Sequence, residues 1–281
     1  MLKQPVLVAS VLASLGISVP AMADTCSQLS DEITHQSGSG AILHGYAALK
    51  ATLHSVVPGP TELPAGSFPL GAALPNGGLG FPMWLTLVDG SGRVCAITNS
   101  LDGSPLNSDV TADIWLASRV ISAQKANTAN SLSTSVLSLA TANLYSAVQP
   151  GGSLFGLQES NPVDPTVAYE GAVANFGTAA DPLVGERVGG VNVFGGGLAL
   201  YSAGKKVGAI GVSGDTSCTD HVVAWKVRAR LSMAYGGFGN FDKLIQDLKQ
   251  PAASQSGFGH PECLNNPTTS NDGGSIVHGN P

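Results

Sequence analysis

The sequence predicts an α+β protein, a single domain with insertions in which helices flank an antiparallel sheet. Apolar residues recur at helical spacing early in the chain, and two pairs of apolar strands each meet at a tight turn. Further helical segments lie between and after these pairs. Regular alternation of single strands and helices would favour a parallel sheet, so the order helix, hairpin, helix, hairpin, helix favours an antiparallel one.

The first helix is predicted over residues 40–57. Apolar side chains recur there at intervals of four, three and four residues, which places them on one helix face. These residues are Ile42, Tyr46, Leu49 and Leu53. A proline follows at position 58. The Gly- and Pro-rich segment 58–82 has no periodicity, so we expect a long loop or insertion there.

The first hairpin is predicted from strands over 83–88 and 93–98. The residues between them read Asp-Gly-Ser-Gly. Asp-Gly between two apolar runs is a strong hairpin signal, because the turn needs residues that tolerate positive φ. A second helix is predicted over 111–132, and we expect 133–148 to continue or restart it.

The second half of the chain is predicted to repeat the pattern. Segment 161–188 contains three prolines and scattered glycines, and we interpret it as a second insertion. The second hairpin is predicted from strands over 198–201 and 207–212, and the last helix over 219–235. A polar tail follows, which we expect to be mobile beyond Asn265.

The N-terminal residues are typical of a secretory signal peptide. A single cation, Lys3, precedes an apolar run over 5–19, and a small-residue Ala-Met-Ala site ends at Ala23. We therefore expect residues 1–23 to be removed and the protein to be periplasmic or secreted. No lipobox precedes Cys26, so a membrane anchor is not expected.

Charge and composition limit the partners. The chain has a formal net charge of -6, and nucleic acid is a poor partner because phosphate binding requires a basic surface. Only 11% of residues are charged, which is well below the typical quarter. A surface so poor in charge favours a protein that buries part of itself in a homo-oligomer.

The four cysteines predict disulfides. An even number in an oxidising compartment suggests two bridges with three possible pairings, and buried free thiols are the alternative. The segment after 236 has few apolar residues to hold it, so we predict that Cys218 and Cys263 tie it to the last helix. Cys26 then pairs with Cys95. No Cys-x-x-Cys occurs, and the His-x-x-Cys at 260–263 is weak as a metal motif.

Three segments carry a family resemblance. They are the hairpin turn Val-Asp-Gly-Ser-Gly-Arg at 88–93, Ala-Gln-Lys-Ala-Asn-Thr-Ala at 123–129, and the glycine-rich hairpin 195–214 followed by Asp220. In order and spacing they resemble the GlcG/HbpS family of haem-binding-like proteins. This family also supplies the C-terminal domain of PduO-type corrinoid adenosyltransferases. The residues around Asp220 are similar to an exported branch of the family.

The resemblance implies the finer architecture. It implies a five-stranded antiparallel sheet with helices around it, in subunits that form dimers and often larger rings. It places a GlcG/HbpS-like domain over 24–240, with insertions at about 58–82 and 161–188 that border the expected pocket. Residues 241–281 are then a C-terminal extension.

Glycines beside the last helix suggest a ligand site. Residues Gly195, Gly196 and Gly197, with the turn at Ser213 and Gly214, let a ligand approach the backbone because no Cβ intervenes. The start of the last helix favours an anionic group, such as a haem propionate or a small carboxylate. Ordinary turn and packing glycines are the alternative interpretation. The spacing of a dinucleotide or phosphate loop is missing.

Three side chains are candidates for contact with the ligand. His221, in the first turn of the last helix, is expected to be neutral and is the candidate ligand for haem iron, or else it packs on Trp225. Lys125 and Thr128 share one helix face, where the lysine would pair with a ligand carboxylate and the threonine would offer an oxygen. A solvated lysine and a packing threonine are the alternative.

The sequence therefore supports three functions. We expect a small-molecule-binding protein rather than an enzyme, with haem or a related tetrapyrrole as the ligand, on the family resemblance. An enzyme acting on a small carboxylate or aromatic compound is the first alternative, with Lys125 as charge anchor and His221 as general base. It lacks a catalytic motif, although a triad assembled in space needs none. An oligomeric accessory or sensory protein without a small ligand is the second alternative.

The signal peptide prediction is tested by mass. Because the small-residue site precedes Asp24, the exported protein is expected to begin at or near that residue. Intact mass spectrometry of the exported protein measures this. A mass that retains residues 1–23 would contradict the prediction.

Overall fold

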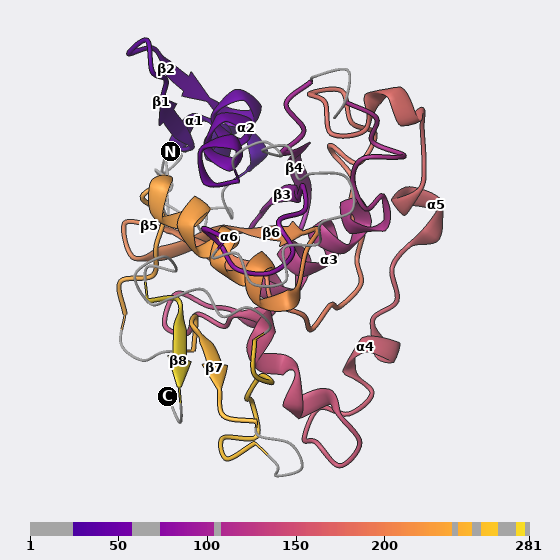
Figure 1. The fold of residues 1–281 in the computed structure, drawn as a ribbon, viewed down its shortest axis with the longest axis vertical. Coiled ribbons are helices and arrows are strands. Elements are labelled where there is room, and N and C mark those ends of the chain that lie inside the picture. The colour runs from indigo at the N-terminus through magenta and orange to yellow at the C-terminus, as the bar shows by residue number, and fades with distance from the viewer. Residues whose placement is uncertain are drawn as a thin grey trace, which may run out of the picture.

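The computed structural model describes most of the chain after the predicted signal peptide. The described residues are 25–57, 74–103, 108–237, 241–248, 254–263 and 274–278. The predicted signal peptide and most of the predicted insertion 58–82 lie outside them. Figure 1 shows the N-terminal elements and the C-terminal strands at opposite ends of the longest axis, with the central sheet and its helices between them.

A four-stranded antiparallel sheet forms the centre of the α+β fold. Its strands are β3 (Trp84–Asp89), β4 (Val94–Asn99), β5 (Gly197–Ser202) and β6 (Lys205–Ser213). They lie in the order β4-β3-β6-β5. Both predicted hairpins form where the sequence places them, and they join through β3 and β6 (Figure 1).

The expected fifth strand is absent from this sheet among the described residues. Irregular backbone covers both edges instead. On β5, the N–H of Tyr201 donates to the carbonyl of Met233, and on β4, Val94 exchanges two hydrogen bonds with residues 185–186. Ser232 has a φ of +57°, which interrupts the extended backbone that a strand requires. The segment after the last helix therefore lies along the sheet edge without forming a strand.

Helices cover both faces of the sheet. α3 (Ala117–Leu132) packs on one face, and α2 (Gly45–Val56) and α6 (Ser217–Arg230) pack on the other. In β3, Leu85 and Leu87 belong to the core with α2 and α6, while Trp84 and Val88 belong to the α3 core. Thr86, between the two leucines, faces α3 through a hydrogen bond with the hydroxyl of Ser122. This alternation is the period of two that strand geometry imposes.

Small residues allow α3 to approach the sheet at backbone distance. Gly197 of β5 and Gly211 of β6 face this helix. A Cβ on Gly197 would collide with the carbonyl oxygen of Lys125, and one on Gly211 with that of Ser122. Glycine at both positions is therefore a packing requirement.

The predicted helix over 133–148 is wrong. The chain leaves α3 as an irregular loop and then forms two 3-10 turns, η1 (Thr141–Leu144) and η2 (Ser146–Val148). The hydroxyls of Ser133 and Thr134 accept hydrogen bonds from backbone N–H groups two to six residues ahead. These side chains offer the backbone an alternative to helical hydrogen bonds, which ends the helix.

The N-terminal region differs at the start of its helix. Residues predicted as the first helical turn instead form β2 (Ile42–His44), which pairs with β1 (Thr34–Gln36). α1 (Cys26–Glu32) precedes this pair. A disulfide joins Cys26 to Cys95 of β4, so it fastens the N-terminal elements to the central sheet.

The C-terminal segment carries the second disulfide, Cys218–Cys263, which joins the start of α6 to this segment. Both pairings are those that the sequence analysis predicts. β7 (Leu244–Gln246) and β8 (Ile276–His278) form a small parallel pair. The expectation of a wholly mobile tail beyond Asn265 is therefore wrong for β8. The domain limits at 24 and 240 stay predictions.

The second predicted insertion is an ordered segment. Next to and within 161–188, short helices form at α4 (Leu157–Ser160), α5 (Pro165–Ala168) and η3 (Val173–Asn175). The buried carboxylate of Asp181 accepts from the guanidinium of Arg119 on α3. This buried ion pair anchors the segment to α3. In the parts of the chain described, no helix is long and apolar enough to cross a membrane.

The Asp181 contact predicts a large stability effect. Asp181→Asn is expected to lower the free energy of unfolding by about 3–5 kcal/mol, because it leaves the Arg119 charge buried and unpaired. Urea unfolding measures this. Asp164→Asn, at the exposed cap of α5, is the matched control and is expected to change little because asparagine caps equally well. Equal urea midpoints for the two variants would contradict the prediction.

Candidate functional site

The structure brings several predicted site residues together around Lys125. This side chain extends from α3 and is 1% exposed. Its Nζ lies 2.6 Å from Oδ2 of Asp220 on α6, and it also donates to the carbonyl of Val212 at 3.1 Å and to the hydroxyl of Ser213 at 3.4 Å. The predicted ligand carboxylate is thus replaced by a carboxylate of the chain itself.

Asp220 is held by the start of α6. Thr216 caps this helix, with its hydroxyl accepting from the N–H of Thr219. The second carboxylate oxygen of Asp220 accepts from the N–H of Asp215 at 3.0 Å. Lys125 and Asp220 therefore connect the helices on opposite faces of the sheet, around the end of β6.

Burial opposes charge on both members of this pair. It raises the pKa of the Asp220 carboxyl to about 7, against the opposite effect of the Lys125 ammonium. Burial likewise lowers the pKa of Lys125, against the effect of Asp220. Each charge is therefore tolerated because the other is present.

His221 follows Asp220 on the same helical turn and points in a different direction. The side chain is 0% exposed, and its Nε2 lies 3.0 Å from the carbonyl of Ser275 and 3.2 Å from the N–H of Leu244. Burial lowers its pKa to about 3, so the ring is neutral as predicted from the helix position. Its ring also contacts Trp225, with centroids 6.2 Å apart. The histidine thus packs between α6 and the β7–β8 pair, away from any open space described.

Thr128 and the predicted glycines are engaged within the chain. The hydroxyl of Thr128 donates to the carbonyl of Gln124 and accepts from the N–H of Asn192. The predicted site contains four glycines, which are Gly195, Gly196, Gly197 and Gly214. A Cβ atom added to any of them would collide with a backbone carbonyl oxygen. They allow backbone segments to approach one another, so the interpretation as packing glycines holds rather than that of a ligand site.

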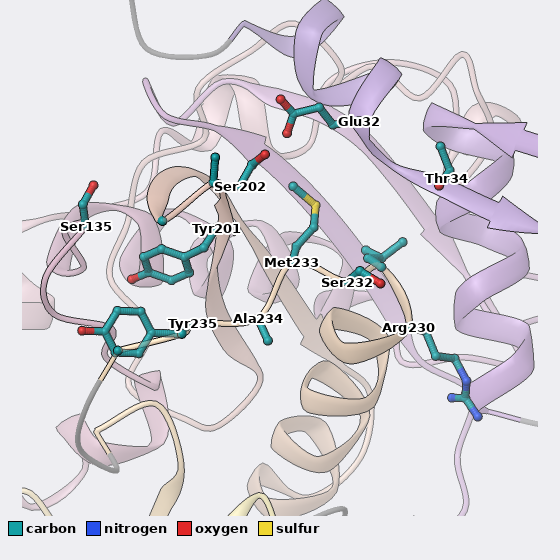
Figure 2. A pocket seen from close by; sticks show the side chains of 15 residues that line it. Glu32, Thr34, Ser135, Tyr201, Ser202, Arg230, Ser232, Met233, Ala234 and Tyr235 are labelled. Carbon is teal, nitrogen blue, oxygen red and sulfur yellow. The ribbon is translucent and has the colours of Figure 1, made fainter.

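Open space lies instead at the C-terminal end of α6. A cavity of about 700 Å³ is bordered by the β5–β6 turn, the end of α6 and the residues before and within β1. Figure 2 shows Met233 between the aromatic side chains and Glu32, with Arg230 at the opposite rim from Tyr201 and Tyr235.

Hydrogen bonds hold the aromatic wall of this cavity in place. The rings of Tyr201 and Tyr235 lie 4.9 Å apart. Their hydroxyls donate to the carbonyls of Thr134 and Val136, at 2.9 Å and 2.8 Å. Burial raises the pKa of Tyr201, so its phenol stays protonated. Sequence reasoning missed this cavity because its lining comes from four separate segments without a motif.

Two sets of potential metal ligands occur in the described residues, and both contain disulfide sulfur. One is Cys218, His260 and Cys263, and the other is Cys26, Asp89 and Cys95. Sulfur in a disulfide is not a thiolate, which is the form that ligates metal. A second, smaller cavity of about 390 Å³ lies near Lys50, Asp102 and Phe176.

These observations define the class of protein. It is an α+β protein with a four-stranded antiparallel sheet between helices, a buried Lys–Asp pair at the end of β6, and an open cavity at the end of α6. A family model described as "Haem degrading protein HbpS-like" matches residues 77–229, which is more than half of the chain. The chain therefore belongs to the HbpS-like family.

Two solved structures are similar to this chain. Klebsiella pneumoniae protein ORFY, described with the family model DUF336, is 26% identical, with a TM-score of 0.35 over 54% of this chain and 76% of ORFY. A PduOC:haem complex is 24% identical, with a TM-score of 0.37 over 56% of this chain and 83% of PduOC. No curated protein matches the chain. The family match carries the assignment.

The Lys125–Asp220 pair predicts non-additive stability. Lys125→Met is expected to lower the free energy of unfolding by about 3–5 kcal/mol, since it leaves a carboxylate buried without its cation. The double variant Lys125→Met/Asp220→Leu is expected to recover part of this loss, because neither charge remains. Urea unfolding of the single and double variants measures the coupling. Strictly additive losses would refute the assignment of this pair as a structural unit.

Proposed function

We propose that this protein binds haem or a related tetrapyrrole. Membership of the HbpS-like family supports the proposal, because the family is described as haem degrading and degradation requires binding. The alternatives of an enzyme for a small carboxylate and of a ligand-free accessory protein have no comparable support.

The predicted site leaves no room for a ligand of this size. Its lysine is paired with Asp220, its glycines contact backbone, and His221 is fully covered. Binding there would require the chain to open, or a neighbouring subunit to reshape it. The cavity at the end of α6 requires neither, and its volume falls in the range of about 300–1,000 Å³ that is usual for small-molecule sites.

The chemistry of the cavity fits a tetrapyrrole. The partly buried ring of Tyr235 offers an aromatic face for a flat macrocycle, and the ring of Tyr201, which is 4% exposed, packs against it. The guanidinium of Arg230, at the exposed rim, suits a propionate. Met233 supplies a thioether, a known type of haem iron ligand. No histidine lines this cavity, so we assign Met233 as the iron ligand. Its side chain is 4% exposed and packs in the central hydrophobic core, so the thioether must turn outward to reach the iron.

The location and assembly of the protein belong to the same proposal. Export to the periplasm or beyond is supported by the two disulfides, which persist in oxidising compartments. Assembly as a homo-oligomer is supported by the low charged fraction. Light scattering of the purified protein measures the oligomeric state.

Haem degradation is a second candidate, favoured by the family description. Bound haem would supply the iron at which oxygen is reduced, and this chain would contribute binding and orientation. Loss of the Soret band in air after addition of ascorbate separates degradation from binding, in which the band persists.

Titration with hemin tests the proposal. The wild-type protein is expected to shift the Soret band on saturable binding. Arg230→Ala is expected to weaken binding by roughly ten-fold to a hundred-fold, because it removes a charge-assisted contact worth about 1.5–3 kcal/mol. Met233→Leu removes the thioether but keeps a side chain of similar volume. It is expected to alter the Soret band or the iron spin state.

Arg187→Ala is the matched control. This exposed arginine bonds to Ser91 and lines neither described cavity, so its removal is expected to leave affinity unchanged. If Lys125→Met alters the spectrum while Arg230→Ala does not, the tetrapyrrole binds at the site predicted from sequence. A wild-type protein that binds no hemin contradicts the function itself.

A further inference from the structure

A serine and a histidine from distant segments meet at the start of α6. Ser217 is the first residue of the helix and is partly exposed. His260, in the segment 254–263, is 5% exposed. The Oγ of Ser217 lies 2.8 Å from Nε2 of His260. This distance is within hydrogen-bond reach, as a nucleophile and its general base require.

Neighbouring groups determine which atom holds the proton. Nδ1 of His260 lies 2.8 Å from the carbonyl oxygen of Pro261. A carbonyl only accepts, so Nδ1 carries the ring proton and Nε2 is left as an acceptor. The N–H of Gly195 donates to Oγ of Ser217 at 2.7 Å. The hydroxyl proton of the serine is therefore directed toward Nε2.

The histidine is suited to act as a base in its resting state. Burial lowers its pKa, so the ring is neutral at physiological pH. The carbonyl of Pro261 occupies the position that a carboxylate has in a serine triad, where it orients the ring and selects its tautomer.

The backbone beside Ser217 offers hydrogen-bond donors. The first helical hydrogen bond of α6 runs from the N–H of Asp220 to the carbonyl of Thr216. The N–H groups of Ser217 and Cys218 precede it, and within the described part of the chain neither has an acceptor. Such donors stabilise the oxyanion that forms when a hydroxyl attacks a carbonyl.

A covalent bond keeps the two residues together. Cys218 follows Ser217 directly, and Cys263 is three residues after His260. Their disulfide therefore ties the segment that supplies the base to the helix that supplies the nucleophile. The His-x-x-Cys spacing, which is weak as a metal motif, here places the base three residues from the disulfide that holds it.

We infer that Ser217 and His260 form a nucleophile and base pair that hydrolyses small carboxylic esters, independently of tetrapyrrole binding. Oγ of Ser217 bonds to the ester carbonyl carbon as its proton passes to Nε2 of His260. The bond to the leaving alcohol then breaks, and the alcohol takes the proton from Nε2. Water attacks the acyl-serine, gives its proton to Nε2, and releases the carboxylic acid as Oγ recovers the proton.

Covalent labelling tests this inference without a variant. Wild-type protein is incubated with a fluorophosphonate, which forms a stable adduct with an activated serine, and peptides are mapped by mass spectrometry. The adduct is expected on Ser217 and on no other serine to a comparable extent. An unlabelled Ser217 overturns the inference.

Variants then test the role of each residue with p-nitrophenyl acetate. Ser217→Ala is expected to remove the adduct and the protein-dependent hydrolysis. His260→Gln is expected to slow labelling of Ser217 by on the order of 100-fold, as loss of a general base does. Detection of the Cys218–Cys263 disulfide in each variant shows that the segment remains docked.

Ser160→Ala is the matched control, since this exposed serine donates to the carbonyl of Leu157, accepts from the side-chain amide of Asn161, and has no histidine partner. It is expected to leave labelling and hydrolysis unchanged. Labelling of Ser217 at the wild-type rate in His260→Gln overturns the assignment of the base. Neither result depends on hemin, so the outcome is separate from that of the haem titration.

Discussion

The close approach of α3 to the sheet is the constraint on which the rest of the structure depends. Gly197 and Gly211 remove the Cβ atoms that would otherwise hold the helix backbone away from β5 and β6. At this separation the side chain of Lys125 reaches past the end of β6 to Asp220, on the helix that covers the other face. Because that charge pair is buried, the two helical layers are fastened to each other as well as to the sheet.

Buried ion pairs hold separate segments of this protein together. Only 11% of the residues are charged, yet three ion pairs are buried in the described residues. Two of the pairs join residues 62 and 95 positions apart, and the third joins residues 14 positions apart. They fasten the second insertion to α3, α3 to α6, and α6 to the residues before β7. Since an unpaired buried charge is costly, each pair specifies one arrangement of the segments it joins.

The two ends of α6 have different surroundings, and the proposed chemistry follows from them. At its start, the Cys218–Cys263 disulfide holds His260 beside Ser217, where helix N–H groups are available. At its end, the chain turns at Ser232 and leaves the cavity bordered by Met233 and Arg230. The first place suits the attack of a hydroxyl on a carbonyl group, and the second suits a flat anionic ligand. The two proposed sites thus lie at opposite ends of one helix and share no residues.

The sequence by itself determined the local elements of this protein. Both hairpins and the α3 helix follow from turn residues and periodicity, which act over short distances. The even number of cysteines left three pairings open, and the shortage of apolar residues after 236 favoured the one that the structure has. Tertiary structure decided whether a residue contacts the chain or a ligand. The glycines at 195–197 read equally well as a ligand cradle or as packing residues, and only the position of neighbouring backbone distinguishes these. No sequence pattern indicated the cavity at the end of α6 or the contact between Ser217 and His260. Residues from separate segments form both, and periodicity does not show which distant segments come into contact.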